Sequence, residues 1–290
     1  MAQEEAKVSQ SKDPCTYSNF HQLKLVHMHL EWKVNFEKKE LDGYCEVTIE
    51  KKESGVTELI LDTKSLKIGD WSVQTNKHIN KSKQKKKKKA SIRSGKVEAF
   101  GEALHIELPK EWCKTSNKGL KVRIAYKTSP EANGIQWLEP SQTAGGKHPY
   151  LFTQFQPILA RTAFPCFDTP GVKSTYTANV TCEKGLVALM SGLADKSDRS
   201  HTDDKWVSYS FRQPVPICSY LVALVVGNLE RRQISPRCDV WCEPSIVDKA
   251  AFEFANMEKF LSIAESICGK YHWSRYDLLC LPPSFPCSFM

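Results

Sequence analysis

A strict alternation of apolar and polar side chains near the amino terminus constrains the fold of this chain most. The apolar positions are Val26, Met28, Leu30, Trp32, Val34 and Phe36. Every residue between them is polar. Because successive side chains of a strand point to opposite faces, this period of two predicts a half-buried strand over 26–36. Leu41-Asp42-Gly43 marks a turn, so residues 44–50 are predicted to return as a second strand.

Similar short apolar segments recur up to Gly227. The further predicted strands cover residues 58–62, 103–108, 120–126, 174–182, 206–211 and 219–227. The longest apolar stretch, 217–226, has half of the roughly 20 residues that a membrane helix needs, so it is interpreted as a strand buried on both faces. Many short strands without intervening helices predict a mainly β domain over 14–227. Its expected architecture is a saddle-like assembly of several sheets packed as a β-sandwich, after a disordered leader at 1–13.

The periodicity changes after residue 244. Ser245 stands three residues before Asp248, which resembles a capping box at a helix start. Apolar residues then recur in steps of three and four: Val247, Ala250, Ala251, Phe254, Met257, Leu261, Ala264 and Ile267. We therefore predict one amphipathic helix over 247–267, ended by Gly269, and a strand over 276–281. Residues 228–290 are interpreted as the incomplete beginning of a second domain.

The net charge of +8 is concentrated in one segment. Residues 77–96 contain ten Lys and Arg residues and no acidic residue, and the rest of the chain carries a net charge of −2. Nucleic-acid-binding proteins spread basic residues over a face and combine them with aromatic or base-reading side chains, and this segment has neither feature. It is interpreted as a disordered, solvated Lys-rich loop between two strands, with contact to a polyanion as the alternative.

The eleven cysteines show no disulfide or metal pattern. Their number is odd and their spacing irregular, which favours free thiols in a cytoplasmic protein, and the polar start of the chain is not a signal peptide. Cys238 and Cys242 lie four residues apart, about 13 Å along a strand, which is too far for a disulfide with each other. His27 and His29 share the solvated face of the first strand. Because no third ligand is near them in the sequence, no zinc site is predicted there.

Several longer motifs resemble one family of zinc aminopeptidases. They are Tyr150-Leu-Phe-Thr-Gln-Phe-Gln-Pro-Ile-Leu-Ala-Arg161, Phe164-Pro-Cys-Phe-Asp-Thr-Pro170, Ile135-Gln-Trp-Leu-Glu-Pro140, Leu186-Val-Ala-Leu-Met-Ser191, Tyr220-Leu-Val-Ala-Leu-Val-Val-Gly227 and Tyr276-Asp-Leu-Leu-Cys-Leu-Pro-Pro-Ser-Phe-Pro286. In order and spacing they resemble the leukotriene A(4) hydrolase and aminopeptidase B-like branch of the M1 zinc aminopeptidases, the gluzincins. The resemblance implies a β-rich amino-terminal domain ending near Gly227, followed by an α+β, thermolysin-like catalytic domain. It also implies the family's activities: removal of amino-terminal residues from peptides with one zinc ion and, in the hydrolase subgroup, opening of the epoxide of leukotriene A(4).

The resemblance further implies a substrate-binding loop, Gln154-Phe155-Gln156, with Pro286 as another substrate-binding position. Many relatives have a glutamate where this chain has Gln156. A neutral amide can accept from a peptide ammonium and also donate to a carbonyl or carboxylate, so Gln156 favours the hydrolase-like subgroup. As an alternative, both glutamines satisfy backbone groups within a loop. Asp168 is interpreted as a structural residue of the adjacent proline-rich turn rather than as an acid catalyst.

The match to the family ends after Pro286. The family continues with Tyr-Gly-Gly-Met-Glu-Asn, whereas this chain reads Cys287-Ser-Phe-Met290. The exopeptidase glutamate and the His-Glu-x-x-His helix, which supply the family's zinc ligands and general base, are absent, so no catalytic residue, metal ligand or cofactor is predicted in this chain. We expect an amino-terminal part truncated before the zinc site and inactive by itself, with a peptide or lipid-epoxide substrate only if a catalytic domain completes it. The alternative is a non-catalytic isoform or interaction module that binds peptide or the full-length enzyme; no membrane or nucleic-acid partner is predicted.

Overall fold

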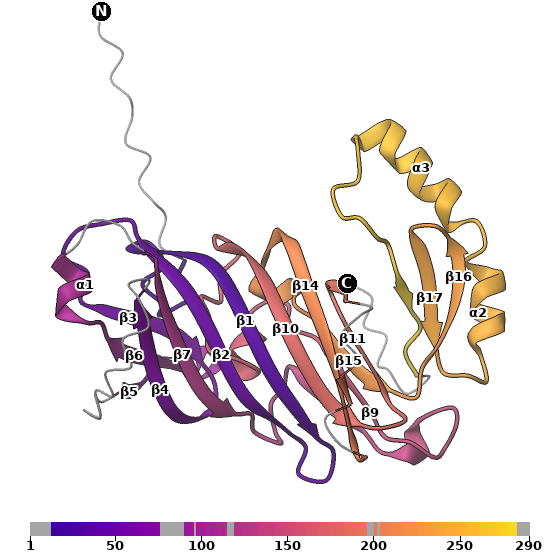
Figure 1. The fold of residues 1–290 in the computed structure, drawn as a ribbon, viewed down its shortest axis with the longest axis horizontal. Helices are drawn as coiled ribbons and strands as arrows, with labels where there is room; N and C mark the ends of the chain where they lie inside the picture. The colour runs from indigo at the N-terminus through magenta and orange to yellow at the C-terminus, as the bar shows by residue number, and fades with distance from the viewer. Residues whose placement is uncertain are drawn as a thin grey trace, which may run out of the picture.

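The computed structural model describes residues 13–75, 90–95, 97–114, 119–195, 200–201 and 204–282. Strands dominate these residues and form four sheets, which confirms the predicted mainly β fold. The long sheet occupies the centre of Figure 1, and a small sheet at its right carries helices α2 (Val247–Glu253) and α3 (Met257–Cys268). The predicted leader lies, except for residue 13, outside the described residues. Within the described ranges no helix is both long and apolar enough to cross a membrane.

The largest sheet has the strand order β12-β14-β10-β1-β2-β7-β4, with β13 paired to β14. Its strands are β1 (Leu23–Asn35), β2 (Glu40–Lys51), β4 (Lys67–Thr75), β7 (Leu120–Lys127), β10 (Lys173–Glu183), β12 (Leu193–Ala194), β13 (Ser200–His201) and β14 (Trp206–Cys218). Neighbouring strands are antiparallel except β1 and β10, which run parallel. The predicted first and second strands are therefore adjacent, as expected of a hairpin.

The predicted alternation of the first strand is confirmed from Met28 to Val34, where the even-numbered residues are buried in the core. Phe36, just after β1, is partly buried and packs against the core. Before Met28, the register of β1 on β2 shifts between Leu25 and His27. The buried positions become Leu23 and Leu25, and Val26 is only half-buried. The predicted inward position of Val26 is therefore wrong, because one extra residue in a strand turns every side chain beyond it to the opposite face.

The second sheet corrects part of the predicted Lys-rich loop. It has the order β3-β6-β5 and consists of β3 (Glu58–Thr63), β6 (Glu102–Glu107) and β5 (Ala90–Ser94). Residues 90–94, expected as the end of the loop 77–96, thus form an edge strand. Its side chains are largely exposed, so pairing with the backbone of β6, rather than burial of side chains, explains this strand. Residues 76–89 and 96 lie outside the described residues.

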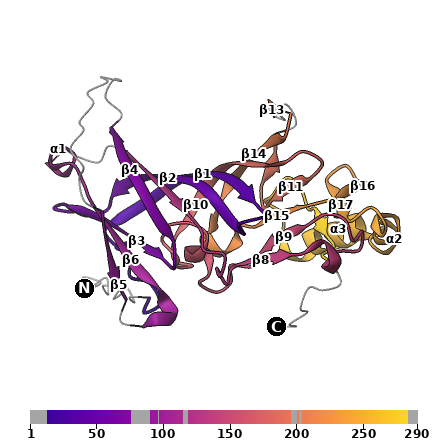
Figure 2. The same cartoon turned by 90° about the horizontal axis from the view of Figure 1, so that it is seen from below.

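The third and fourth sheets connect the long sheet to the helices. The third sheet has the order β11-β15-β9-β8 and the fourth the order β16-β17-β18. Their strands are β8 (Ile135–Leu138), β9 (Tyr150–Thr153), β11 (Val187–Met190), β15 (Leu224–Gly227), β16 (Glu230–Ser235), β17 (Cys238–Cys242) and β18 (Leu278–Leu279). Figure 2 shows the third sheet between the long sheet and the helices.

The apolar stretch 217–226 is not one strand. It comprises the end of β14, the 3₁₀ turn η4 (Ser219–Leu221) and the start of β15. The Ser219 hydroxyl donates to Asp168 Oδ1 at 2.7 Å, and the Val222 N–H donates to the Ser219 carbonyl at 3.1 Å. These bonds close a turn, so that the chain leaves the long sheet and enters the third.

The predicted helix 247–267 is interrupted between α2 and α3. The N–H of Ala255 donates to the Phe252 carbonyl, and that of Met257 donates to the Phe254 carbonyl. Each bond spans three residues, which tightens the backbone and ends the regular helix. The predicted strand 276–281 contains only the two residues of β18, which run parallel to β17. The remaining short helices are α1 (Lys110–Lys114), η1 (Glu98–Phe100), η2 (Pro140–Gln142) and η3 (Ala160–Thr162).

Candidate substrate-binding loop

The predicted substrate-binding residues open the segment that follows β9, which we call the QFQ loop (residues 154–162). The Gln154 N–H donates to the Gly134 carbonyl at 2.9 Å, which fastens the loop to the chain before β8. A Cβ atom at Gly134 would lie 2.6 Å from Thr162 Oγ1 and 2.9 Å from the Leu159 carbonyl oxygen. Only a glycine therefore allows the two segments to approach this closely.

Phe155 is the anchor of the QFQ loop. Its side chain is 2% exposed, and its ring packs edge-to-face on Phe164 with the centroids 5.9 Å apart. Phe164 in turn packs on Trp32, the largest fully buried side chain of the core. A side chain enclosed by the core in this way holds its neighbours in place. The role of Phe155 in substrate binding stays a prediction.

Gln154 and Gln156 flank this anchor and are both exposed. Neither side-chain amide forms a hydrogen bond with another described residue, so the alternative that they satisfy backbone groups of their loop is not supported. The peptide bond between Gln156 and Pro157 is cis. Each free amide offers two donors and one acceptor to a ligand.

A buried arginine supports the loop from behind. Arg161 is fully buried, and its Nε atom donates to Asp168 Oδ2 at 2.9 Å. Its terminal nitrogens donate to the carbonyls of Phe100 at 2.6 Å and Cys15 at 2.9 Å. Burial disfavours the guanidinium charge, but Asp62 and Asp168 overcome this and raise the pKa of Arg161. Arg161 thus stays charged while it joins the loop to two distant segments.

The two carboxylates around Arg161 are also fully engaged. Asp62 accepts from the backbone N–H groups of Tyr17 at 2.7 Å and Asp168 at 3.0 Å. Asp168 accepts from Ser219 with its other oxygen. The structural role predicted for Asp168 is therefore supported, although its partners are Arg161 and Ser219 and not its neighbours in the turn. No role was predicted for Arg161; a charged residue directly after the apolar run Ile158-Leu-Ala160 was the available signal.

The described residues do not fit the zinc ion of the resembled family. Among them, no three His, Cys, Asp or Glu side chains lie close enough together to hold a metal ion. The His27 and His29 rings instead hydrogen-bond to threonines of β10, with Nδ1 atoms 2.8 Å from Thr175 Oγ1 and 2.9 Å from Thr177 Oγ1. We therefore derive no metal-dependent step from these residues. Pro286, the remaining predicted substrate-binding residue, lies outside the described residues.

A groove of about 500 Å³ lies elsewhere in the molecule, between the edge of the long sheet and the segment after α3. Its lining includes Gln213 and Leu221 on one side and Trp273 and Tyr276 on the other. None of the three residues of the Gln154–Gln156 motif lines it. The groove is therefore separate from the QFQ loop.

Comparison with known proteins covers most of the chain. The family model of the peptidase M1 N-terminal domain matches residues 17–221. The chain is 40% identical to leukotriene A-4 hydrolase of Xenopus laevis over 275 residues, which are 94% of this chain and 43% of that protein. It is 41% identical to leucine aminopeptidase 2 of Yarrowia lipolytica, over 97% of this chain and 40% of that protein.

Solved structures agree with these sequence matches. The structure of native leukotriene A4 hydrolase from Saccharomyces cerevisiae superposes with a TM-score of 0.81 at 32% sequence identity. The match covers 97% of this chain and 41% of the yeast chain. This chain therefore spans about two fifths of the length of the relatives that it matches.

Proposed function

Since the chain belongs to the peptidase M1 family through its amino-terminal domain, we propose that it supplies the substrate-facing QFQ loop of an aminopeptidase of the leukotriene A(4) hydrolase type. In this proposal Gln154 and Gln156 hold a substrate while a catalytic domain of the relatives' kind supplies the zinc and the general base. The proposed activity of the complete protein is removal of amino-terminal residues from peptides, or opening of a lipid epoxide. The described residues contribute binding and orientation and no bond-breaking step.

One observation carries this proposal: the two exposed glutamine amides have no hydrogen-bond partner among the described residues, although the backbone around them is fastened at several points. Phe155 lies between them in the core, Gly134 fixes the backbone, and Arg161 fixes the far end of the loop. Because the backbone of the loop is already held in place, ligand binding costs little backbone ordering, and the hydrogen bonds of the amides contribute more to affinity. Such an arrangement supports recognition of a peptide ammonium and carbonyl rather than a purely structural role.

A chimera tests the proposal. Residues 13–282 would replace the matching segment of the Xenopus enzyme, and kcat/KM for an aminoacyl substrate would be measured. We expect Gln154→Ala and Gln156→Ala each to lower kcat/KM by about tenfold or more, because a hydrogen bond to a charged group contributes roughly 1.5–3 kcal/mol. Gln74→Ala, at an exposed glutamine of β4, is the matched control and should leave kcat/KM unchanged. Full activity of both loop variants, in a chimera as active as the parent, would rule the proposal out.

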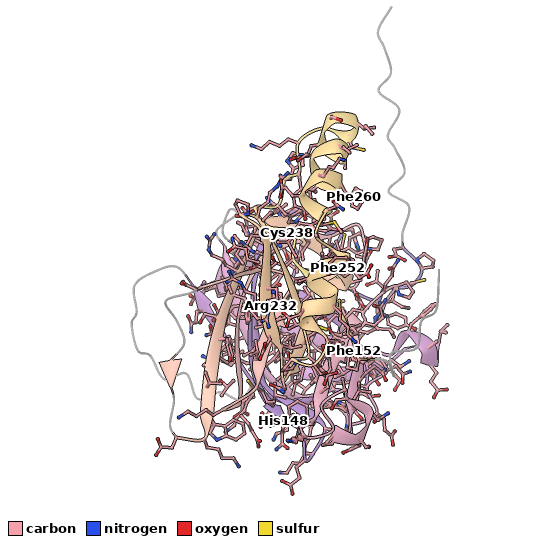
Figure 3. The ribbon with its side chains drawn as sticks, turned by 90° about the vertical axis from the view of Figure 1, so that its right-hand side faces the viewer. His148, Phe152, Arg232, Cys238, Phe252 and Phe260 are labelled. Atoms are coloured by element: carbon pink, nitrogen blue, oxygen red, sulfur yellow. The ribbon has the colours of Figure 1, made fainter. Side chains whose placement is uncertain are left out.

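The second candidate, a non-catalytic interaction module, is favoured by a different observation. Four large apolar side chains of α2 and α3 are exposed, namely Phe252, Phe260, Ile263 and Ile267; we call them the α2–α3 face. Figure 3 shows Phe252 and Phe260 on the helices and Arg232 and Cys238 on the neighbouring strands. Exposed apolar surface of this kind marks a contact with another polypeptide. This candidate predicts that the chain binds a protein partner even when Gln154 and Gln156 are replaced, whereas the first does not.

The remaining parts of the proposal concern location and partners. The proposed cytoplasmic location is supported by the free thiols expected from the irregular spacing of the cysteines. The polyanion alternative depends on residues 77–96, of which 77–89 and 96 lie outside the described residues. It would give binding that weakens steeply with salt.

A further inference from the structure

Two cysteines that are distant in the sequence lie side by side in the fourth sheet. Cys242 ends β17, and Cys280 directly follows β18. The two strands are parallel, with Val240 opposite Leu278 and Trp241 opposite Leu279. The Cys280 N–H donates to the Trp241 carbonyl at 3.0 Å, so the pairing continues by one residue. The next pair in this register is Cys242 with Cys280.

The spacing of paired strands suits a disulfide. Neighbouring strands lie about 4.8 Å apart, and the Cα atoms of a disulfide are usually 4.4–6.8 Å apart. Residues opposite each other in a sheet also project their side chains to the same face. The two thiols also lie close enough for each to influence the pKa of the other. No backbone movement across the sheet is needed to join them.

The surroundings give the two sulfur atoms different accessibility. Cys242 is fully buried, whereas Cys280 is partly exposed. Burial, followed by the charge of Cys280, raises the pKa of the Cys242 thiol to about 12. Burial also raises the pKa of Cys280. Glu243 and the Tyr150 phenol face the same cluster. Cys280 is therefore the thiol that a dissolved oxidant reaches first, and reaction is slow at neutral pH because little thiolate is present.

We propose that Cys242 and Cys280 are a modification site that closes to a disulfide, with a low-molecular-weight disulfide such as glutathione disulfide as the oxidant. The Cys280 thiolate attacks glutathione disulfide, which forms a mixed disulfide and releases one glutathione thiolate. The Cys242 thiolate then attacks the Cys280 sulfur and displaces the second glutathione. The two protons lost by the cysteines are taken up by the two glutathione thiolates, so two cysteines are oxidised while one glutathione disulfide is reduced.

The bond would act on the segment between β17 and β18, which exposes several large apolar side chains. It closes a loop from 242 to 280 that contains both α2 and α3, and it fastens β18, which has only two residues, to β17. A disulfide that closes a loop of this length stabilises chiefly by restricting the unfolded chain. The inference is independent of the proposed substrate loop. The sequence spacing drew attention only to Cys238 and Cys242, and gave no reason to expect that Cys242 pairs with Cys280.

Peptide mapping tests the proposal. The purified chain is incubated at about pH 8.5 with excess glutathione disulfide, digested with trypsin without reduction and analysed by mass spectrometry. We expect a cross-linked pair of peptides 238–249 and 276–290 whose mass is lower by two hydrogens and which dithiothreitol separates. The rate of formation should rise about tenfold per pH unit while the pH is below the pKa of the attacking thiol.

Four serine variants distinguish the partners, because each of the two peptides contains a second cysteine. Cys242→Ser and Cys280→Ser should each abolish the cross-link, whereas Cys238→Ser and Cys287→Ser should each retain it. Oxidation should also raise the melting temperature by roughly 5 °C or more, and dithiothreitol should reverse this. A cross-link that persists in Cys242→Ser, or a stable glutathione adduct on Cys280 without a cross-link, would overturn the proposal. Cys268, which is exposed, lies on a separate peptide and reports general oxidation.

Discussion

The region up to Gly227 and the segment from 228 to 282 bury their apolar side chains to very different extents. In the first region one continuous core contains residues from all three of its sheets. In the second, buried apolar residues are few, and it holds five of the eight exposed large hydrophobic side chains found among the described residues. Both have regular apolar periodicity. Periodicity therefore determines which face of an element is apolar, but burial requires an opposing surface.

The two regions also differ in where their charges lie. Arg161 is enclosed with Asp62 and Asp168 inside the first region. In the second, Arg232 and Arg237 form ion pairs at the surface. Breaking a buried pair leaves an uncompensated charge in a medium of low dielectric constant, whereas water replaces the partner at the surface. The regions meet at a small second cluster in which Tyr150 and Phe152 pack with Leu229.

Replacement of Arg161 should have the largest effect. We expect Arg161→Met to lower the free energy of unfolding by about 3–5 kcal/mol, because Asp62 and Asp168 would remain buried without their cation. Urea denaturation measures this change. The matched variant Arg232→Met removes a surface arginine that is 38% exposed and should have a much smaller effect. Equal losses for both variants would show that the contrast between buried and surface charges does not hold.

Replacing one phenylalanine in each region should give the second-largest difference in stability between the two regions. Phe152 is 3% exposed and Phe252 is 80% exposed. We expect Phe152→Ala to destabilise by roughly 3 kcal/mol, since it leaves a cavity in the second cluster. Phe252→Ser should change stability by less than about 0.5 kcal/mol while reducing self-association, because it interrupts the α2–α3 face. Urea melts and light scattering measure the two quantities. Unchanged scattering of Phe252→Ser would show that this face does not drive association.

As the pH is lowered, α3 should lose its protection from hydrogen exchange before the long sheet does. Arg237 binds both oxygens of Glu265, at 3.1 and 2.7 Å, and this pairing is the main reason that the pKa of Glu265 falls to about 2 from an ordinary 4.5. Because the folded pKa is the lower one, the pair contributes fully above the unfolded value and is lost as the pH falls from about 4.5 towards 2. Hydrogen exchange should therefore accelerate in residues 257–268 over this range. Glu265→Gln should weaken the dependence, and the part that remains comes from Glu258, which also pairs with Arg237. Constant protection of α3 down to pH 2 would contradict this role.

Local patterns predicted the elements well where one strand or helix decides its own geometry. Strands β1, β2, β7, β10 and β14 of the long sheet overlap the predicted strands, whereas β4, β12 and β13 were not predicted. The amphipathic stretch after 247 is helical apart from its break. The errors arise where another segment intervenes. A register shift on β2 moved Val26, pairing with β6 made residues 90–94 a strand, and a bond to Asp168 turned the chain at Ser219.

The QFQ loop likewise has features that the sequence predicted and features that depend on distant segments. The motif around Gln154 and Gln156 was recognisable from the residues alone, and both side chains are exposed. The alternation Gln-Phe-Gln also contained a signal that Phe155 points the other way, which the family resemblance obscured. The support by Arg161 was not predictable, because its partners Asp62, Phe100 and Cys15 are 61 to 146 residues away.

The sequence by itself determined the mainly β character of this chain, the faces of most of its strands, its family and the two glutamines that we propose bind a substrate. These follow from side-chain periodicity and from motifs within a few residues of one another. Only the tertiary structure decided that Phe155 is an anchor, that Arg161 holds the loop, and that Cys242 meets Cys280 rather than Cys238. The physical reason is that such contacts depend on the order and register in which distant strands pair, and that pairing minimises the free energy of the whole core rather than of any one segment.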